Sequence, residues 1–326
     1  MDLQQTNDPI LAALQRGGVP CKLQERMARH TTFSIGGAAR YFVCPRRETE
    51  LRAALRIFSD ADLPIVILGR GSNVLFSDDG FQGAVICMTG LRSLYKIEDA
   101  SAAAAGQQLI FAECGVTLRE LAAFAAECAL SGLEFAHGIP GTVGGAIRMN
   151  AGAFGGEIGA VVDHVCCCHR QSGEIETISG DDFAFSHRHS LLSERTELVC
   201  LSAVFKLPLP PAEDDARETM RHNIHQTMED YKQRRRSTQP LEYPSAGSIF
   251  KRPTGHYAGK LIEDCGLKGL QIGGAQVSPK HAGFIINRGG ATAEDVRTLI
   301  TRIKQVVNER FGVLLEEEVL YLGDER

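Results

Sequence analysis

Residues 138–159, GIPGTVGGAIRMNAGAFGGEIG, are the most informative stretch of the chain, because eight of these 22 residues are glycine. Glycine loses more backbone entropy on ordering than any other residue, so such a density needs a physical reason. Backbone held close to a bulky, phosphate-bearing ligand is such a reason, since main-chain N–H groups in a concave segment bind anions. The stretch therefore predicts a cradle for a nucleotide cofactor.

A second glycine-containing stretch lies upstream of this cradle. Gly69, Gly71, Ser72 and Asn73 directly follow the apolar run IVIL, where bare backbone and small polar side chains are suited to phosphates or ribityl hydroxyls. The pattern is GxGxxV and the next residues, FSDDGF, have no helical period, so it fails the test for a Rossmann dinucleotide fold. Paired with the later cradle, it favours a bound cofactor over an ordinary turn.

The pattern around these stretches predicts an α+β fold. Between residues 33 and 205, short apolar runs alternate with turn residues, and two stretches with leucines, alanines and phenylalanines at helical spacing interrupt them. A proline-rich segment, KLPLPPAEDD, leads out of this half into a polar helix. A last helix is predicted from Glu294 to Phe311 between the caps Thr292 and Gly312, with Val296, Leu299, Ile300, Ile303, Val306, Val307 and Phe311 on one face. A short strand from Glu318 to Leu322 closes the chain.

These changes in pattern predict three parts. Residues 1–30 form an N-terminal helix and lead-in, residues 31–206 a cofactor-binding domain of two α+β subdomains, and residues 207–326 a C-terminal substrate-binding domain. A chain of 326 residues is long enough for more than one hydrophobic core and for a deep cofactor site.

Composition excludes several classes of function. The net charge of −5 gives no global field for nucleic acid, and no apolar run reaches the roughly 20 residues of a membrane span. The start of the chain, MDLQQTNDPI, lacks the basic and apolar regions of a signal peptide. We therefore expect a cytoplasmic protein that binds neither nucleic acid nor a membrane. Its oligomeric state is left open, and a monomer is compatible with the sequence.

The ten cysteines predict no metal site and no disulfide framework. None of them forms a CxxC pair, and the consecutive residues Cys166, Cys167 and Cys168 point to opposite faces of a strand. We expect reduced, mostly buried thiols.

Two residues are candidates for binding an acidic substrate or for catalysis on it. Arg188 lies in DDFAFSHRHS, where alternation predicts a strand that places the arginine on one face with Ala184 and Ser186. A face of small residues leaves room for its bidentate fork to reach a carboxylate or phosphate. Ser248, in PSAGSIFKRP, lacks the GxSxG setting of a hydrolase nucleophile, but its hydroxyl is suited to deliver a proton. The structural alternatives are a surface arginine at a strand end and a capping serine.

Glu318 is the third candidate. Strand parity places it on one face with Leu320 and Leu322, and burial of that face would raise the pKa of its carboxyl group, as suits a general acid or a partner of an enolate. The run KQRRR, residues 232–236, is suited to a diphosphate, with a solvated helix end as the alternative.

Taken together, six segments in order resemble the UDP-N-acetylenolpyruvoylglucosamine reductase family over roughly residues 25–323. The compact stretch that ends in KHAGFIIN is similar to the family's shorter subtype, which lacks an inserted loop over the substrate. The matching segments are HTTFSIGGAARYF, LGRGSNVLFSDDGF, GLEFAHGIPGTVGGAIRMNAGAFGGEIG, QPLEYPSAGSIFKRP, AGKLIEDCGLKGLQIGGAQVSPKHAGFIIN and EEEVLYLG.

The resemblance implies an FAD-binding half of the vanillyl-alcohol-oxidase type and a C-terminal substrate domain. It implies that NADPH reduces the flavin, and that the enolpyruvyl sugar nucleotide then enters the same cleft and is reduced to UDP-N-acetylmuramate for peptidoglycan. The implied FAD-binding residues are Gly69, Arg70, Gly71, Ser72, Asn73, Pro140, Gly141, Thr142, Gly144, Gly145, Asn150 and Gly152.

The resemblance also assigns roles to the three candidates. Arg188 and Glu318 match the pair that polarises the substrate carboxylate, and Ser248 matches the proton donor to C2. The implied substrate-binding residues are Arg234, Lys251, Arg252 and His281. His187 stands where the family usually has tyrosine, and since imidazole titrates near neutral pH, we expect it to shift the pH dependence of turnover.

Two other functions stay open at this stage. One is a sugar or alcohol oxidase with the same flavin fold, although no covalent attachment motif accompanies His137 at the edge of the cradle. The other is a catalytically silent protein that binds nucleotide sugars. The set of Arg188, Ser248 and Glu318 favours reduction of a conjugated acid over both.

Overall fold

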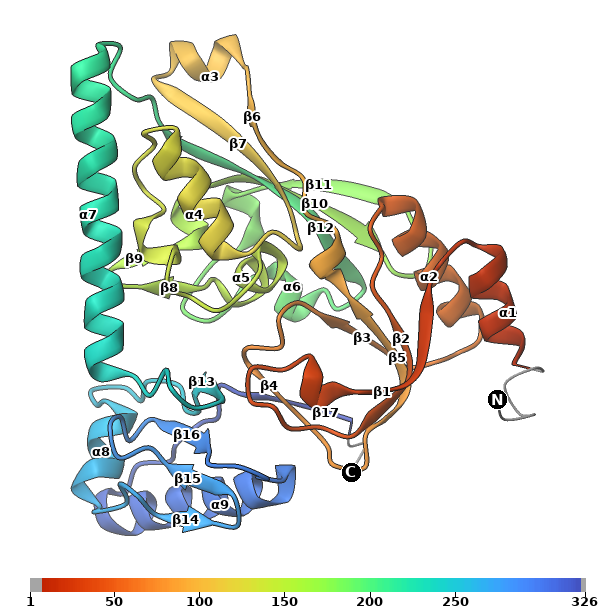
Figure 1. The fold of residues 1–326 in the computed structure, drawn as a ribbon, viewed down its shortest axis with the longest axis vertical. Helices are drawn as coiled ribbons and strands as arrows, with labels where there is room; N and C mark the ends of the chain where they lie inside the picture. Colours follow the sequence, from red (N-terminus) through yellow and green to blue (C-terminus); the bar gives the residue numbers. More distant parts are fainter. Residues whose placement is uncertain (1–7, 324–326) are drawn as a thin grey trace. The chain divides into compact units, whose positions relative to one another are not determined.

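The computed structural model describes residues 8–323, which form two compact units (Figure 1). Each unit is assembled from several stretches of the chain. Unit 1 takes the described residues up to Cys21 together with Val43–Gly69 and Val85–Gln233. Unit 2 takes Lys22–Phe42, Arg70–Ala84 and the described residues from Arg234 onward. Both units mix helices and strands, so the predicted α+β class is confirmed.

Unit 1 contains a five-stranded antiparallel sheet with the order β11-β10-β12-β7-β6. Its long central strand, β12, is buried over nearly its whole length, as its apolar run predicts. The strands are β6 (Leu94–Ile97), β7 (Gln107–Glu113), β10 (Val162–His169), β11 (Ile175–Ser179) and β12 (Leu198–Pro208).

Helices of unit 1 begin where the sequence supplies a cap. The side chain of Asp8 accepts hydrogen bonds at the start of α1, and Thr117 forms a capping box with Glu120 at the start of α4. α5 packs against β7 and β12, and it lies within the glycine-rich stretch (Figure 1). The helices are α1 (Pro9–Arg16), α2 (Glu48–Asp60), α3 (Ala100–Ala104), α4 (Leu118–Glu127), α5 (Val143–Met149) and α6 (Leu191–Glu194), and a small hairpin joins β8 (Gly152–Ala153) to β9 (Gly156–Glu157).

A four-stranded sheet has the order β1-β2-β5-β3. β3 is followed by a turn and then by the short strand β4 (Val74–Phe76) rather than by a helix, which agrees with the failed Rossmann pattern. The strands are β1 (Cys21–Arg26), β2 (Ala38–Val43), β3 (Ile65–Leu68) and β5 (Phe81–Cys87).

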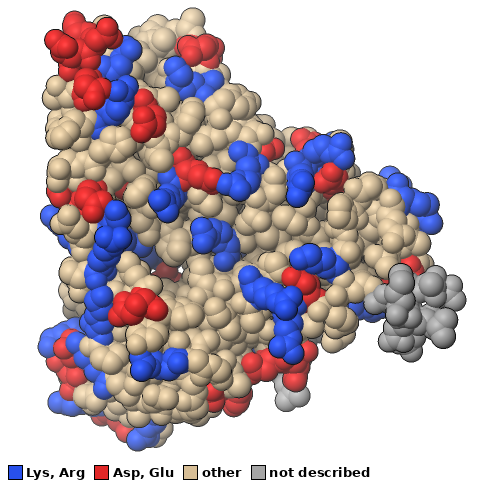
Figure 2. Space-filling model, in the orientation of Figure 1, with Lys and Arg blue, Asp and Glu red and all other residues tan. Residues whose placement is uncertain are grey.

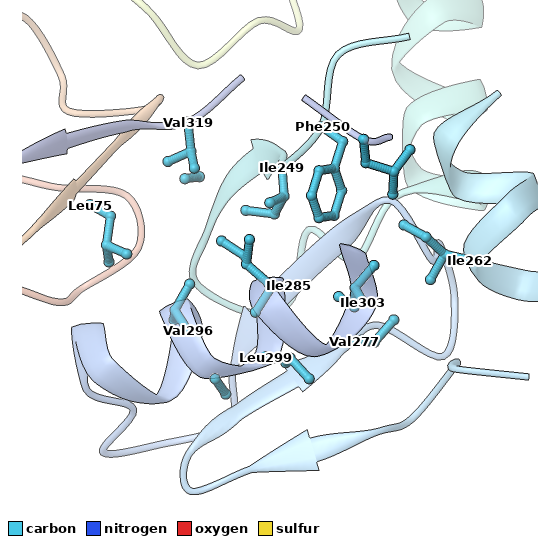
Figure 3. Close-up of a cluster of buried hydrophobic side chains, with 14 of the residues drawn as sticks. Leu75, Ile249, Phe250, Ile262, Val277, Ile285, Val296, Leu299, Ile303 and Val319 are labelled. Carbon is cyan, nitrogen blue, oxygen red and sulfur yellow. The ribbon is translucent and has the colours of Figure 1, made fainter. Parts of the chain in front are cut away.

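Unit 2 is built around a second antiparallel sheet with the order β13-β16-β15-β14, which α9 covers. Its core is one cluster of buried aliphatic side chains, in which Val277 and Ile285 of the sheet face Leu299 and Ile303 of α9 (Figure 3). The elements are α8 (Ala258–Asp264), α9 (Ala293–Phe311), β13 (Ser245–Ser248), β14 (Gln271–Ile272), β15 (Ala275–Val277), β16 (Phe284–Asn287) and β17 (Leu320–Leu322), which pairs in parallel with β4.

α9 confirms most of its prediction from the sequence. Thr292 and Asp295 form a capping box at its start, and Gly312 ends it in the left-handed conformation. Most of the predicted apolar face is buried, but Val306 is only half-buried and Phe311, at the end of the helix, is 39% exposed. Burial of the face therefore ends before the last turn of the helix.

The long helix α7 (Asp214–Thr238) is polar, and only Ile224 and Met228 are buried among its 25 residues. Its C-terminal end carries the predicted basic run, with Arg235 and Arg236 in the last turn. Figure 2 shows basic side chains gathered along this end of the helix. Within residues 8–323, no helix is long and apolar enough to cross a bilayer.

All ten cysteines are free thiols, and five of them are buried. Cys166, Cys167 and Cys168 lie on β10 as predicted. No group of three or more histidine, cysteine or acidic side chains in the described part of the chain is arranged to hold a metal ion.

Candidate active site

Unit 2 brings two of the candidate catalytic residues together. The backbone N–H of Glu318 donates to the carbonyl of Ile249, at 2.8 Å, next to Ser248. Their neighbours Ile249 and Val319 are buried in the hydrophobic cluster of Figure 3, being 0% and 3% exposed. Backbone pairing and a packed core therefore fix the two main chains beside each other, although 69 residues separate them in sequence.

Ser248 ends β13 with its side chain half-buried. Its Oγ donates a hydrogen bond to the carbonyl oxygen of Phe250 at 3.2 Å. A Cβ placed on Gly283 would lie 3.6 Å from this Oγ and 3.1 Å from Cε1 of His281, so the imidazole lies near the serine. The hydroxyl is thus oriented by a backbone acceptor and sits in a mixed polar setting.

His281 is held in a defined orientation. Its Nδ1 accepts the backbone N–H of Gly283 at 3.1 Å, and its ring packs edge-on against Phe284 with centroids 5.0 Å apart. Burial lowers the pKa of His281, which favours the neutral imidazole. With Nδ1 as the acceptor, the ring proton is carried by Nε2.

The face that carries Glu318, Leu320 and Leu322 is not the buried one. β17 begins at Leu320, two residues after Glu318, and Leu320 is 38% exposed while Val319 is 3% exposed. The buried position is therefore Val319, because the segment before β17 pairs with residues 249–251 and turns its odd-numbered side chain into the core. Glu318 is half-buried, and a raised pKa for its carboxyl group stays a prediction.

Asn73 has a structural contact that the sequence gave no reason to expect. Its Nδ2 donates to the carbonyl oxygen of Glu318 at 3.0 Å, and its own carbonyl accepts the N–H of Leu320 at 3.0 Å. The end of the predicted cofactor loop and the backbone of Glu318 are therefore tied to each other within unit 2. A local sequence pattern cannot predict a contact between residues 245 positions apart.

In unit 1, Arg188 lies at the tip of a tight turn and not in a strand. Ser186 and His189 exchange backbone hydrogen bonds of 3.1 Å each, with His187 and Arg188 between them. Arg188 has a φ of +58°, a left-handed conformation that costs free energy for a branched-chain or long side chain. The alternation in the sequence is misleading because Ala184 is also left-handed, with a φ of +51°, and breaks the strand.

Asn150 holds the Arg188 turn in place. It is 2% exposed, ends α5 with a φ of +40°, and its Nδ2 donates to the carbonyl of Ser186 at 3.0 Å. Its Oδ1 accepts the N–H of Gly159 at 2.9 Å. The sequence placed Asn150 at the cofactor; the structure adds that it positions the turn that carries Arg188.

In unit 1, Gly69 at the start of the first predicted cradle stretch lies against the second stretch. A Cβ on Gly69 would lie only 2.5 Å from Oγ1 of Thr142, so the loop after β3 lies against the residue that starts α5. Gly71 has a φ of +60°, and a Cβ there would come within 2.4 Å of the carbonyl of His30. Bare backbone is thus required on the loop, and its small polar residues fit the phosphates of a dinucleotide.

Part of the glycine density serves the protein's own packing. A Cβ on Gly156 would lie 2.4 Å from the ring of Phe135, and one on Gly159 would lie 2.6 Å from the ring of Phe185. At Gly145, by contrast, no atom comes closer than Oγ1 of Thr142 at 3.7 Å. The glycine density therefore has two causes, since aromatic rings of the protein itself require Gly156 and Gly159, whereas no such contact explains Gly145.

The predicted substrate-binding cations are exposed side chains. Arg234 lies near the end of α7, and Lys251 pairs with Glu316 at 3.4 Å. The guanidinium of Arg252 stacks over the ring of Tyr257 at 4.0 Å. Exposed pairs of this kind are weak and free to rearrange when a ligand binds.

Two family models match successive stretches of the chain. An FAD binding domain model matches residues 39–177, and a model of the C-terminal domain of UDP-N-acetylenolpyruvoylglucosamine reductase matches residues 239–322. These matches define a flavoprotein whose C-terminal stretch matches a domain model of one reductase family.

Relatives along nearly the full length identify the family. The chain is 45% identical to UDP-N-acetylenolpyruvoylglucosamine reductase of Caldicellulosiruptor bescii, over 95% of this chain and 93% of that protein. It is 44% identical to the reductase of Geobacillus thermodenitrificans, over 92% of both chains. The chain belongs to the UDP-N-acetylenolpyruvoylglucosamine reductase family, whose members are FAD-dependent oxidoreductases, and the resemblance found in its sequence is confirmed.

The fold agrees with that family. The crystal structure of UDP-N-acetylenolpyruvylglucosamine reductase from Thermus caldophilus superposes with a TM-score of 0.74 at 31% identity, and covers 93% of this chain and 98% of the other. The predicted flavin-binding fold class is therefore confirmed.

Proposed function

We propose that this protein uses FAD and NADPH to reduce UDP-N-acetylglucosamine enolpyruvate to UDP-N-acetylmuramate, in the cytoplasm. This reaction supplies a precursor of peptidoglycan, and through it cell wall formation, cell shape and division. Membership of the family supports the activity. The observation that carries the assignment of residues is the pairing of Glu318 with the residue next to Ser248 in unit 2.

The residues have complementary roles in this proposal. Bound FAD supplies the hydride chemistry at C3 of the enolpyruvyl group. Negative charge then develops on the substrate carboxylate and C2, where Arg188 and Glu318 stabilise it through charge-assisted hydrogen bonds. The hydroxyl of Ser248 delivers the proton to C2. The hydrogen bond from Ser248 Oγ to the carbonyl of Phe250 keeps this hydroxyl in a defined position before substrate arrives.

The conformation of Arg188 supports its role. A left-handed arginine is retained only where surrounding contacts enforce it, and such strain gathers at functional sites. The buried amide of Asn150 enforces it here through the carbonyl of Ser186. A guanidinium on a fixed turn loses less entropy when it binds a carboxylate.

The cofactor assignment rests on the contact between the loop after β3 and the start of α5. Residues of these two stretches present backbone and small side chains, as FAD requires. We assign FAD to Gly69, Arg70, Gly71, Ser72, Asn73, Pro140, Gly141, Thr142, Gly144, Gly145, Asn150 and Gly152, and the sugar nucleotide to Arg234, Lys251, Arg252 and His281.

An anaerobic absorption titration tests the proposed activity. NADPH is added to the flavin-loaded protein first, and UDP-N-acetylglucosamine enolpyruvate follows. We expect the flavin band to bleach with NADPH and to return with the sugar nucleotide. A band that bleaches and does not return would refute the substrate, and a protein that takes up no FAD on reconstitution would refute the cofactor.

Ser248→Ala tests the proton donor. Reoxidation of reduced flavin by the substrate should slow by about 10²- to 10⁴-fold, the usual contribution of a positioned acid, while reduction by NADPH stays near wild type. Stopped-flow absorption measures both half-reactions. Ser245→Ala, on the same strand, is the matched control and should leave both rates close to wild type. Equal losses in the two half-reactions would remove Ser248 from this role.

A further inference from the structure

Two cysteines of unit 1 differ from the others in their surroundings. Most of the thiols are inert, because burial raises their pKa; Cys114, Cys167 and Cys200 are the clearest cases. Cys44 is half-buried, and it directly follows β2. Cys87 is the last residue of β5, which is the neighbour of β2 in the sheet. The topology thus brings the ends of two adjacent strands, each with a cysteine, to one place.

The two sulfur atoms share one hydroxyl group. Oγ1 of Thr89 lies 3.2 Å from Sγ of Cys87 and 3.7 Å from Sγ of Cys44. The two thiols also shift each other's pKa, which lowers that of Cys44 and raises that of Cys87. Their main chains approach closely as well, since a Cβ on Gly90 would lie 2.2 Å from the carbonyl of Pro45. A disulfide needs this kind of approach, with Cα atoms about 4.4–6.8 Å apart.

The pair is polarised into a nucleophile and a partner. The hydrogen bond from Cys87 and then that from Thr89 lower the pKa of Cys44 to about 6, with help from the Gly90 N–H and the charge of Arg46. The same interaction and burial raise the pKa of Cys87. Cys44 is therefore the thiolate near neutral pH, and Cys87 holds its proton beside it.

We propose that Cys44 and Cys87 form a peroxide-oxidisable dithiol, and that their disulfide loosens the flavin by displacing the loop that begins at Gly69. The second half of this statement rests on the proposed position of the cofactor. The oxidant is a hydroperoxide, of which hydrogen peroxide is the simplest.

The reaction balances in two steps. The thiolate of Cys44 attacks one peroxide oxygen, the O–O bond breaks, and hydroxide leaves, which gives a sulfenic acid. The sulfur of Cys87 then attacks the Cys44 sulfur and displaces its oxygen, and the proton of Cys87 leaves with that oxygen as water. Two thiols lose two electrons in total, and peroxide gains them as two molecules of water.

The disulfide would act on the cofactor loop through a short path. Sγ of Cys87 contacts the carbonyl of Gly69 at 3.8 Å, and β3, which ends at Leu68, is the neighbour of β5. An S–S bond is about 2.05 Å long, which is shorter than any contact between non-bonded sulfurs, so the two residues must move toward each other when it forms. Gly69 lies so close to Thr142 that even a Cβ does not fit between them, so a shift of Cys87 disturbs the fit of the two cradle stretches.

Mass spectrometry of the full-length, flavin-loaded protein tests the proposal. After hydrogen peroxide treatment and alkylation of the remaining thiols, we expect a linked Cys44–Cys87 peptide that dithiothreitol cleaves. Free flavin, measured by fluorescence after ultrafiltration, should increase in the oxidised sample and return to the protein on reduction. Cys128→Ser removes a thiol that is also half-buried but has a raised pKa, and it should behave as wild type.

Two variants separate the roles of the sulfurs. In Cys87→Ser, dimedone should trap a sulfenic acid on Cys44; in Cys44→Ser, Cys87 should stay unmodified, and neither variant should release flavin on oxidation. Absence of the linked peptide, or a linked peptide with unchanged flavin release, would overturn the proposal. A protein that holds no flavin before peroxide is added would instead refute the cofactor assignment, and the linked peptide can still be sought in it.

Discussion

The two regions that carry the candidate catalytic residues are held in different ways. In unit 2, Ser248 and Glu318 lie on backbone segments joined by hydrogen bonds, and their neighbours Ile249 and Val319 are buried in one cluster. In unit 1, Arg188 lies at the tip of a turn with a φ of +58°. The first arrangement is supported by many small packing contacts, whereas the second is held by the backbone pair of Ser186 and His189 and by the buried side chain of Asn150.

The difference has consequences for mutation. A packed cluster distributes its stabilisation over many side chains, so a polar change beside it alters chemistry more than structure. A strained turn persists only while its surroundings enforce it. We therefore expect substitutions in the Ser248–Glu318 region to act on the rate alone, and substitutions around Arg188 to act on both the rate and stability.

Glu318→Gln should have the largest effect of the three changes that follow. It replaces an acidic carboxyl group, proposed to stabilise the developing negative charge in its protonated form, by an amide that is a weaker hydrogen-bond donor, so reoxidation of flavin by substrate should slow by about 10²- to 10³-fold. The free energy of unfolding should stay near wild type, because Val319 and not Glu318 fills the core. Glu316→Gln is the control, since Glu316 is exposed and its pair with Lys251 contributes little. A large loss of stability in Glu318→Gln would contradict the comparison of the two regions.

Asn150→Asp is the matching test for unit 1. Aspartate keeps an acceptor for the N–H of Gly159 and tolerates a positive φ, but it has no donor for the carbonyl of Ser186. The free energy of unfolding, followed by urea denaturation, should fall by about 1–3 kcal/mol because a buried carbonyl loses its partner. Substrate reduction should slow as the Arg188 turn loosens.

The affinity for FAD distinguishes the two roles of Asn150. If the side chain mainly positions the turn, the variant should bind FAD nearly as well as wild type and lose rate in the substrate half-reaction. If FAD affinity falls while the rate per bound flavin is unchanged, Asn150 is a cofactor ligand and the turn is held by other contacts.

His281 gives the smallest effect, on the pH dependence of stability in unit 2. Burial lowers its pKa in the folded protein, so in the window between that lowered value and the ordinary value of about 6.5 the unfolded chain binds more protons. The free energy of unfolding should therefore rise with pH through this window and fall again on acidification. His281→Gln should reduce the slope of the unfolding free energy against pH by an amount that corresponds to less than one bound proton. His256→Gln, at an exposed position, should leave this slope unchanged. Identical slopes in His281→Gln and wild type would show that the imidazole is not held neutral.

Much of the fold could be predicted from the sequence. The helical spacings give α2, α4 and α9, and each predicted apolar run falls largely on a strand. These runs are IVILG (65–69), GAVICM (83–88), LIFAECG (109–115), VVDHVCCCH (161–169) and LVCLSAVF (198–205). The cap residues Thr292 and Gly312 set the ends of α9 as expected. These features are local, since hydrophobic periodicity and helix capping depend on a few neighbouring residues.

The features that were missed depend on distant contacts. The turn at Arg188 is set by left-handed residues and by Asn150, neither of which an alternating pattern reveals. The burial of Val319 in place of Glu318 follows from pairing with residues 249–251. Glycines such as Gly159 are required by an aromatic ring elsewhere in the unit and not by a ligand.

By itself, the sequence determined most of the secondary structure, the flavoprotein class and the family, because periodicity, caps and ordered motifs can be read without knowing which residues are in contact. The tertiary structure alone decided that Glu318 meets the neighbour of Ser248, that Asn150 holds the Arg188 turn, and that Cys44 meets Cys87. The physical reason is that hydrogen bonds and side-chain packing act over a few ångströms in space, and the residues they join lie tens to hundreds of positions apart in the chain.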